Sequence, residues 1–484
     1  MKSLKTNILL YTIRNLVVIL FPLIIQPYVV RKLGVEQIGI CEFSKSIVSY
    51  FIMLAGLGVA NYLIREGSKL KQHSVELEEL MNEVYSINAL STCMAYLGLL
   101  TLTLLNNNIR QYASLIAIYS LQIFFTTIGK EYILIIYEDF FYITIRAIIV
   151  QAITLAMIFL FIKSPEDVEL FALFSLISSC GALFTNVFYT RKHIRIHLCK
   201  PSKSWLKHFK PIITLFAMTA TLTVYTSSDI TLLGILVGDH SVGIYSVATK
   251  IYALVKGLIA SVLVVFVPRI SGLIGQKNNC EIEILSDKVY SLLLSITIPA
   301  SAMVIIESKD IVTTVASLDF IDSGLSLSIL GIALTIAVCA YFWEQCILIP
   351  YGQEKNVLII TIISAIINIV LNIVFIPVWN EKAAALSTLI AELISFFLSR
   401  HFGKKYIKKI NVVAIFVKSL LGCIPGILLI YMIQIHFQIN YVIRLIATGV
   451  IFSLIYVLCE LILGNEIIRN NLIDLFTKIK IFRE

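Results

Sequence analysis

Fourteen long apolar runs, separated by short polar segments, make up most of the chain. Each run covers about 19 to 27 residues, close to the ~20 that a helix rising 1.5 Å per residue needs to cross about 30 Å of hydrocarbon. The pattern predicts an all-α polytopic membrane protein with about 14 transmembrane helices, and it requires no strands. The predicted helices are 8–30, 38–62, 84–105, 111–134, 143–163, 169–190, 211–237, 242–268, 288–307, 324–349, 356–377, 382–400, 412–434 and 441–463.

The composition agrees with this pattern. Of the 484 residues, 58% are hydrophobic and 14% are charged, whereas a soluble protein carries roughly 25% charged residues. The first apolar run is long enough to span a membrane and no small-residue cleavage site follows it, so we expect no signal peptide. The nine cysteines lie mostly inside apolar runs, with neither metal-ligand spacing nor a paired framework, and we expect them to fill the core.

The basic residues are distributed unevenly between the two sides. With both termini in the cytoplasm, 27 of the 39 Lys and Arg residues fall in inner segments and seven in outer turns. The positive-inside rule therefore predicts two cytoplasmic termini, and the net charge of +9 reflects topology rather than nucleic-acid binding. The longest predicted outer loop is 308–323, about sixteen residues, which leaves no room for an extracytoplasmic catalytic domain.

A weak internal repeat suggests how the helices are grouped. The segment 33–40 (LGVEQIGI) is similar to 237–244 (VGDHSVGI) at an offset of 204 residues, and each copy joins two predicted helices. Six helices separate the copies, so the halves are predicted to be parallel repeats with a site at their interface. The predicted domains are an N-lobe (1–190), a cytoplasmic linker (191–210), a C-lobe (211–400), and helices 13–14 with a cytoplasmic tail (401–484).

Charged residues inside the predicted helices are the main candidates for function. Asp229 and Lys250 lie about ten residues on either side of the turn at Gly238-Asp239, so they reach the same depth in a helical hairpin and can pair. A charge at the bilayer centre costs roughly 2.5–3.5 kcal/mol, so such residues usually face a bundle interior or a watery cavity. Asp229 is either half of a structural salt bridge or a titratable carboxylate that exchanges its partner for H+ or Na+.

Three further cations, Lys45, Lys256 and Arg14, are predicted to line the same positive cavity as Lys250. The alternative is that each extends its charge to the interface or pairs locally. Lys130 and Glu131 lie close to the end of helix 4, where a mutual or interfacial pair is favoured.

Two asparagines are the last candidates for the site, and several other polar residues are not expected to belong to it. Asn368 and Asn372, four residues apart, share one helix face and can hydrogen-bond either to other helices or to sugar hydroxyls. Glu344, Glu392 and Glu460 lie near predicted helix ends and are interpreted as interfacial. The seven histidines are expected to be solvated or to lie at the headgroups. No nucleotide-binding loop, metal site or nucleophile constellation is present in the sequence, so we expect no catalytic residue, metal or cofactor beyond a coupling ion, H+ or Na+.

Several short motifs follow one another along the chain up to about residue 400. They are Phe21-Pro22-Leu23-Ile24, Pro27-Tyr28, Arg31-Lys32-Leu33-Gly34, Ser46-Ile47-Val48-Ser49-Tyr50-Phe51, Leu57-Gly58, Ile64-Arg65-Glu66, Ser164-Pro165-Glu166-Asp167, Val242-Gly243-Ile244-Tyr245-Ser246, Val267-Pro268-Arg269 and Ile347-Leu348-Ile349-Pro350. The order of these motifs resembles that of O-antigen and capsular polysaccharide flippases, in the multidrug/oligosaccharidyl-lipid/polysaccharide exporter superfamily. The resemblance includes Asp229 and Lys250.

The resemblance implies two six-helix lobes around a central cavity, two added C-terminal helices, and alternating access across the bacterial inner membrane. It implies an undecaprenyl-diphosphate-linked oligosaccharide as substrate and, as partners, the bilayer, a polysaccharide polymerase and a chain-length regulator. Fixed positive charge suits a diphosphate that must cross hydrocarbon. Two alternatives are a multidrug or small-cation antiporter of the same superfamily, which would present acids to its cavity, and a membrane glycan polymerase or ligase, which would need a large outer loop.

Overall fold

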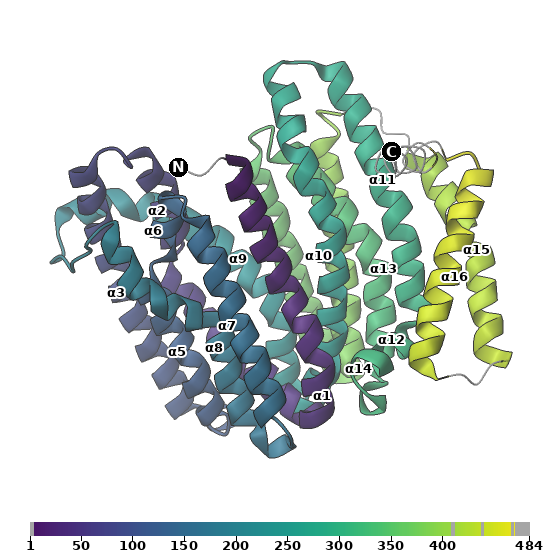
Figure 1. Cartoon of the computed structure of the whole chain (residues 1–484), viewed down its shortest axis with the longest axis horizontal. Coiled ribbons are helices and arrows are strands. Elements are labelled where there is room, and N and C mark those ends of the chain that lie inside the picture. The colour runs from purple at the N-terminus through teal and green to yellow at the C-terminus, as the bar shows by residue number, and fades with distance from the viewer. Residues whose placement is uncertain (1–3, 408–411, 437–439, 466–468, 470–484) are drawn as a thin grey trace, which may run out of the picture. The chain divides into compact units, whose positions relative to one another are not determined.

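The computed structural model describes residues 4–407, 412–436, 440–465 and 469. These residues form helices joined by short turns, without strands in the described ranges (Figure 1). Within these described ranges, eleven helices are long and apolar enough to cross a membrane. The predicted fold class is confirmed. The predicted cytoplasmic tail lies almost entirely outside the described residues.

Two long helices each cover two of the predicted spans, although the predicted span 38–62 continues beyond the first of them into α2 (Val59–Lys69). Helix α1 (Leu4–Gly56) is interrupted at Gly34, where φ is 79° and ψ is 175°, and this break separates the predicted spans 8–30 and 38–62. Helix α14 (Glu354–Gly403) is interrupted in the same way at Asn380, where φ is 50° and ψ is −131°. The left-handed φ at Gly34 suits a residue without a Cβ.

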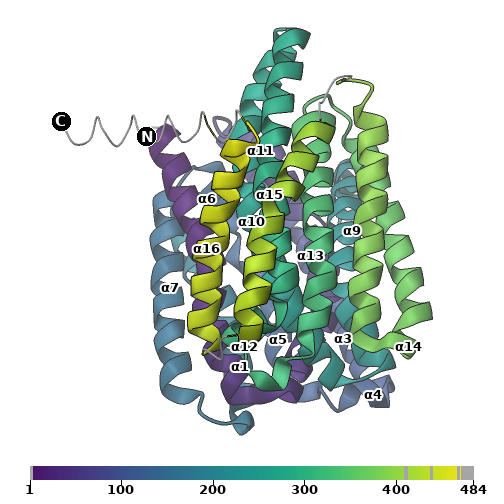
Figure 2. The same ribbon diagram turned by 90° about the vertical axis from the view of Figure 1, so that its right-hand side faces the viewer.

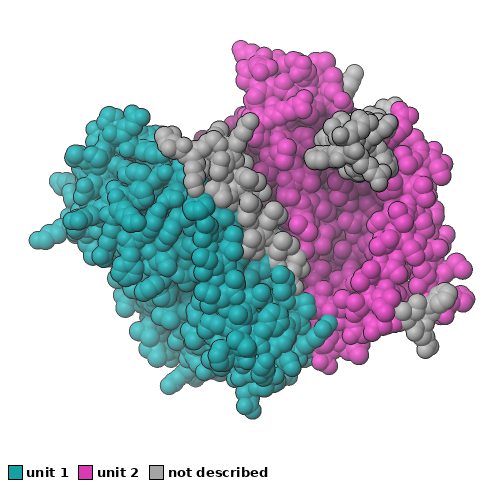
Figure 3. Space-filling view, in the orientation of Figure 1, with its two compact units in different colours: residues 1–243 teal, residues 244–484 magenta. Residues whose placement is uncertain are grey.

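The chain divides into two compact units, residues 1–243 and 244–484, which Figure 3 shows in different colours. The division falls near the beginning of α10 (Asp239–Gly275). One helix, α9, separates this point from the linker predicted at 191–210. The predicted lobe boundaries stay a prediction.

In unit 1, the part of α1 after Gly34 packs against α3, α5 and α9, while α5 packs against α8 and α7 against both α1 and α8. The predicted span 111–134 is divided between two helices, α5 and α6, which meet at Lys130. The helices of this unit are α2 (Val59–Lys69), α3 (Ser74–Leu105), α4 (Asn107–Arg110), α5 (Ala113–Gly129), α6 (Glu131–Ile136), α7 (Phe140–Phe161), α8 (Val168–Tyr189) and α9 (Leu206–Leu236).

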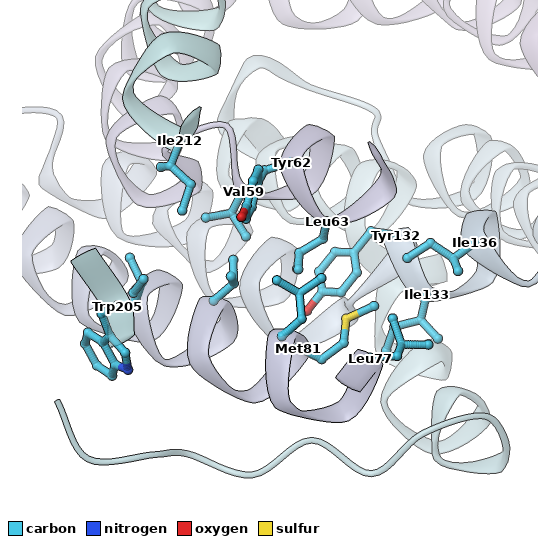
Figure 4. Close-up of a cluster of buried hydrophobic side chains, with 13 residues drawn as sticks. Val59, Tyr62, Leu63, Leu77, Met81, Tyr132, Ile133, Ile136, Trp205 and Ile212 are labelled. Carbon is cyan, nitrogen blue, oxygen red and sulfur yellow. The ribbon is translucent and has the colours of Figure 1, made fainter. Parts of the chain in front are cut away.

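A cluster of thirteen buried apolar side chains joins α2, α3 and α6 to the beginning of α9 (Figure 4). Leu63, Met81 and Ile133 are fully buried in it, and Trp205 covers one end. Buried apolar area stabilises by about 25 cal/mol per Å². The cluster therefore fixes the segment that precedes α9 onto the polar ends of α2 and α3.

In unit 2, α13 packs between α11 and α14, and α15 and α16 run side by side against α11 (Figure 2). Arg444 of α16 binds Asp310 of α12 with two hydrogen bonds of 2.6 Å, and the Tyr456 hydroxyl donates to the Ser295 carbonyl at 2.9 Å. The helices are α11 (Asn279–Ile306), α12 (Ser308–Val315), α13 (Ser323–Phe342), α15 (Val412–His436) and α16 (Tyr441–Ile462), with a π-helical segment at Trp343–Leu348.

Candidate functional site

Lys45 lies close to two aromatic rings inside unit 1. Its Nζ donates to Glu42 Oε1 at 3.0 Å and lies 5.4 Å from the Tyr119 ring centroid and 5.5 Å from that of Phe171. The lysine comes from α1, and the two rings come from α5 and α8. A cation over an aromatic face gains about 0.5–2 kcal/mol, depending on its desolvation. The site therefore holds its cation with one carboxylate and two rings.

Arg14 belongs to a different cluster of unit 1, in which one carboxylate serves two guanidinium groups. Arg14 and Arg146 each contact Glu131, through Oε1 and Oε2 respectively, at 3.0 Å. Arg146 is almost fully buried. Lys130, the predicted partner of Glu131, instead lies 4.0 Å from the Tyr85 ring centroid. The predicted Lys130–Glu131 pair is therefore replaced by an Arg–Glu–Arg cluster.

Asp229 is buried in α9, with 8% of its surface exposed, beside hydroxyl-bearing side chains of α1. Its charge interacts with the phenol of Tyr50. The Tyr50 and Thr231 hydroxyls are 3.0 Å apart, and Thr231 donates to Ser46 at 2.9 Å. Ser49 donates to a serine of α9 at 3.1 Å. The carboxylate thus lies in a polar seam between α1 and α9.

Lys256 of α10 pairs with a carboxylate of α14 inside unit 2. Its Nζ donates to Glu392 Oε1 at 2.6 Å, and the Tyr252 hydroxyl donates to the same oxygen at 3.3 Å. Only 6% of the Glu392 side chain is exposed. Glu344 lies near this pair and accepts hydrogen bonds from Ser395 and a second serine of α14, each at 2.9 Å. Unit 2 therefore holds one buried carboxylate, Glu392, and one half-buried carboxylate, Glu344, beside one lysine.

The predicted set of cations is distributed over the two units. Lys45 and Arg14 belong to unit 1, whereas Lys250 and Lys256 lie on the part of α10 that belongs to unit 2. The predicted Asp229–Lys250 pair joins residues of different units and stays a prediction. The single positive cavity predicted for all four cations also stays a prediction.

Asn368 and Asn372 lie on one face of α14, as their spacing predicts. The Asn372 amide donates to Asn368 Oδ1 at 3.2 Å, and both side chains are buried within unit 2. A direct role toward sugar hydroxyls stays a prediction.

Sequence reasoning missed the acidic partners and one buried histidine. Glu42 precedes Lys45 by three residues, a spacing that places both on one helix face and so could have revealed the pair. Glu392 carries no such signal, because its partner is 136 residues away in the sequence. His208, interpreted as solvated, is buried between the Tyr62 hydroxyl and Glu83 Oε2, at 2.8 Å from each.

The fold and the buried ion pairs define a multi-pass α-helical membrane protein with charged groups inside both units. The chain belongs to the family described as polysaccharide biosynthesis protein, whose model matches residues 4–274. A second model, MatE, matches residues 214–374. The family resemblance predicted from the sequence is thereby confirmed.

Individual proteins are similar over most of the chain. A Shigella dysenteriae protein named "Putative O-antigen transporter" is 23% identical over 402 residues, which cover 81% of this chain and 98% of that protein. Among solved structures, lipid II flippase MurJ in an inward closed conformation has a TM-score of 0.79 at 19% identity, covering 95% of this chain and 100% of that one. An inward-facing multidrug resistance MATE family transporter has a TM-score of 0.61 at 12% identity, covering 81% and 95%. The similarity of this chain to these two solved structures identifies its fold.

Proposed function

We propose that this protein is a flippase that moves undecaprenyl-diphosphate-linked oligosaccharide units across the bacterial inner membrane for O-antigen or another surface polysaccharide. The observation that carries the proposal is the similarity to an O-antigen transporter along 98% of that protein's length. Membership of the polysaccharide biosynthesis family and the MurJ-like fold support it. In this proposal the chain is a transporter rather than an enzyme, and both of its termini are cytoplasmic.

The half-buried lysines inside the two units supply the chemistry for an anionic substrate. Lys45 and Lys256 each have a carboxylate within hydrogen-bonding distance, so neither is an unneutralised charge. We propose that the substrate diphosphate displaces Glu42 from Lys45, or Glu392 from Lys256, and binds that lysine itself. H+ or Na+ then neutralises the released carboxylate. The exchange keeps the number of unpaired charges low, which matters because each costs roughly 2.5–3.5 kcal/mol at the bilayer centre.

Asp229 and Lys250 are proposed to act in the same way. Asp229 already lies among hydroxyl groups that can stabilise either a carboxylate or its protonated form. Alternating access, ion coupling, and cooperation with a polymerase and a chain-length regulator complete the proposal.

The test is transport by the purified full-length protein in liposomes loaded with a fluorescent undecaprenyl-diphosphate oligosaccharide. We expect an impermeant glycan-modifying reagent to reach inner-leaflet substrate in a protein-dependent manner. The triple variant Lys45→Gln, Lys250→Gln, Lys256→Gln should lose this activity while inserting normally, whereas Lys71→Gln, at an exposed ion pair, should keep it. Wild-type transport by the triple variant would refute the role of the lysines. No movement by the wild type would refute the flippase.

A multidrug or small-cation antiporter is the second candidate, favoured by the MatE match over residues 214–374. The sequence shows more cations than acids inside the predicted helices, but this excess does not distinguish a flippase from an antiporter. The structure places the carboxylates of Glu42, Glu344 and Glu392 beside the lysines. Efflux of a cationic dye from the same liposomes separates them. Dye efflux without glycan movement would favour the antiporter.

A further inference from the structure

A small basic cavity lies in unit 1, where α8 ends and α3 begins. Its volume is about 270 Å³. Two arginines and two histidines of the segment that follows α8 form much of its wall. It is lined by Ser74, Glu78, Tyr137, Arg191, His193, Ile194, Arg195 and His197. Pockets for drug-sized ligands usually measure about 300–1,000 Å³, so this one fits a compact group rather than a sugar chain.

The wall that carries the basic side chains is held in place by backbone contacts to α3. The His197 N–H donates to Asn82 Oδ1 at 2.7 Å, and the Cys199 N–H donates to Ser86 Oγ at 2.8 Å. On the opposite side, the His193 ring stacks on Tyr137 with centroids 4.5 Å apart. The cavity is therefore built from segments that are tied together, and its shape does not depend on surface side chains alone.

Several polar groups of this cavity lack an ion-pair or hydrogen-bond partner, although the Arg191 guanidinium lies 5.9 Å from the Phe188 ring centroid. Among the residues that the structure describes, neither Arg191 nor Arg195 makes a salt bridge, and the buried Nε2 atom of His193 has no hydrogen-bond partner. Ser74 begins the 32-residue helix α3, whose first N–H groups carry a partial positive charge. Glu78 is the one carboxylate in the lining, and the two guanidinium groups outweigh it.

We propose that this cavity binds a phosphate group. Guanidinium groups match phosphate oxygens in planar, bidentate hydrogen bonds, and a helix N-terminus with a serine hydroxyl adds donors of the same kind. The apolar span that includes α8 ends at Lys192, so the cavity lies where the headgroup layer of a bilayer begins. The phosphate can come from an anionic phospholipid, from a polyprenyl diphosphate, or from a soluble phosphate compound. The site is separate from the half-buried lysines and does not depend on what the protein transports.

The test uses the full-length protein in phosphatidylcholine nanodiscs, titrated calorimetrically with inorganic pyrophosphate. Hydrogen bonds to charged groups contribute about 1.5–3 kcal/mol, so Arg191→Gln with Arg195→Gln should weaken binding at least tenfold. Lys200→Gln with Lys203→Gln removes the same charge from the same segment outside the lining and should leave affinity within about twofold. His193→Phe keeps the ring on Tyr137 but removes Nε2, and should weaken binding about threefold to tenfold.

Nanodiscs that also contain phosphatidic acid or undecaprenyl diphosphate identify the source. The lipid that occupies the cavity should raise the apparent dissociation constant for pyrophosphate in the wild type and not in the arginine variant. If neither lipid does so while pyrophosphate still binds, the ligand is a soluble phosphate compound. Absence of pyrophosphate binding, or equal weakening by the arginine and lysine pairs, would overturn the proposal.

Discussion

Gly39 packs directly against the backbone carbonyl of Asp239, so closely that a methyl group at Gly39 would overlap the carbonyl oxygen. Gly243 makes the equivalent contact with the carbonyl of Val35. The 204-residue offset of the sequence repeat carries Val35 onto Asp239 and Gly39 onto Gly243. The two repeat turns therefore contact each other reciprocally, as equivalent surfaces do around a local two-fold axis. The weak repeat marks a real structural relationship.

The first prediction is that Gly39→Ala destabilises the protein. The overlapping atoms belong to backbone, which cannot change rotamer, so we expect the overpacking cost of about 1–3 kcal/mol. Gly257→Ala, on the same helix as Gly243 but with open space around it, is the matched control and should be neutral or slightly stabilising. Thermal unfolding of both variants in detergent measures the difference. Equal midpoints would show that the close contact is not required.

The second prediction concerns the Lys256–Glu392 pair. Removing either charge leaves its partner buried and unpaired, which costs up to about 3–5 kcal/mol in a closed site and less here, because 28% of the Lys256 side chain is exposed. Lys256→Gln and Glu392→Gln should each lower stability. The double variant should recover part of the loss, with a coupling energy of about 0.5–3 kcal/mol. Strictly additive losses in a thermodynamic cycle would contradict the contact.

The positions of the membrane helices along the chain were predictable because an apolar run must match the hydrocarbon thickness. Their ends were less so, since α3 begins at Ser74 instead of 84 and α11 at Asn279 instead of 288. The predicted turn at Gly238-Asp239 is present, since α9 ends at Leu236 and α10 begins at Asp239. Apolar runs do not specify which side of a helix meets which neighbour. Glu392 was therefore interpreted as interfacial from its position near a run's end, although Lys256 of another helix lies within 2.6 Å of it.

His208 illustrates the same limit. Its position in a basic segment predicted a solvated side chain, yet Tyr62 and Glu83 approach it from helices far away in the sequence. Glu83 also accepts hydrogen bonds from Lys207 at 3.0 Å and from Ser204. The pattern of charged residues along the chain correctly predicted that the segment 191–210 is polar. Only the folded packing of α2, α3 and α9 shows that part of it is buried and partnered.

The third prediction separates a structural role of Arg14 from a role in transport. Glu131→Gln leaves the Arg14 and Arg146 guanidinium groups without their shared carboxylate, and we expect a loss of about 2 kcal/mol or more. Glu138→Gln breaks the exposed Lys71–Glu138 pair and should cost no more than about 1 kcal/mol. Thermal unfolding compares the two variants directly.

Arg14→Gln then distinguishes the two roles. If Arg14 serves mainly to anchor α1, this variant should lose stability to about the same extent as Glu131→Gln, and the folded fraction should retain transport. Full stability combined with lost transport would instead place Arg14 among the substrate-binding cations.

The last prediction is a pH dependence that originates at Glu307, between α11 and α12 and outside the apolar spans. Burial raises the pKa of this carboxyl above its ordinary value, the nearby Thr448 hydroxyl opposes the shift, and the Asp310 carboxylate adds to it. The pKa of Glu307 is higher in the folded protein than in the unfolded chain. At a pH between these two pKa values, Glu307 is therefore protonated more often in the folded protein. The stability contributed by this group is therefore lost as pH rises through the folded-state pKa.

Glu307→Gln removes the ionisation, so the variant should be more stable than the wild type at pH 8, and the advantage should diminish below pH ~4, where both states are protonated. Thermal midpoints measured from pH 4 to pH 8 test this difference. Glu281→Gln, at an exposed position in the first turn of α11, controls for the loss of one negative charge. An advantage of Glu307→Gln that stays constant over the whole pH range would mean that amide packing, and not the buried carboxylate's ionisation, sets the stability at this position.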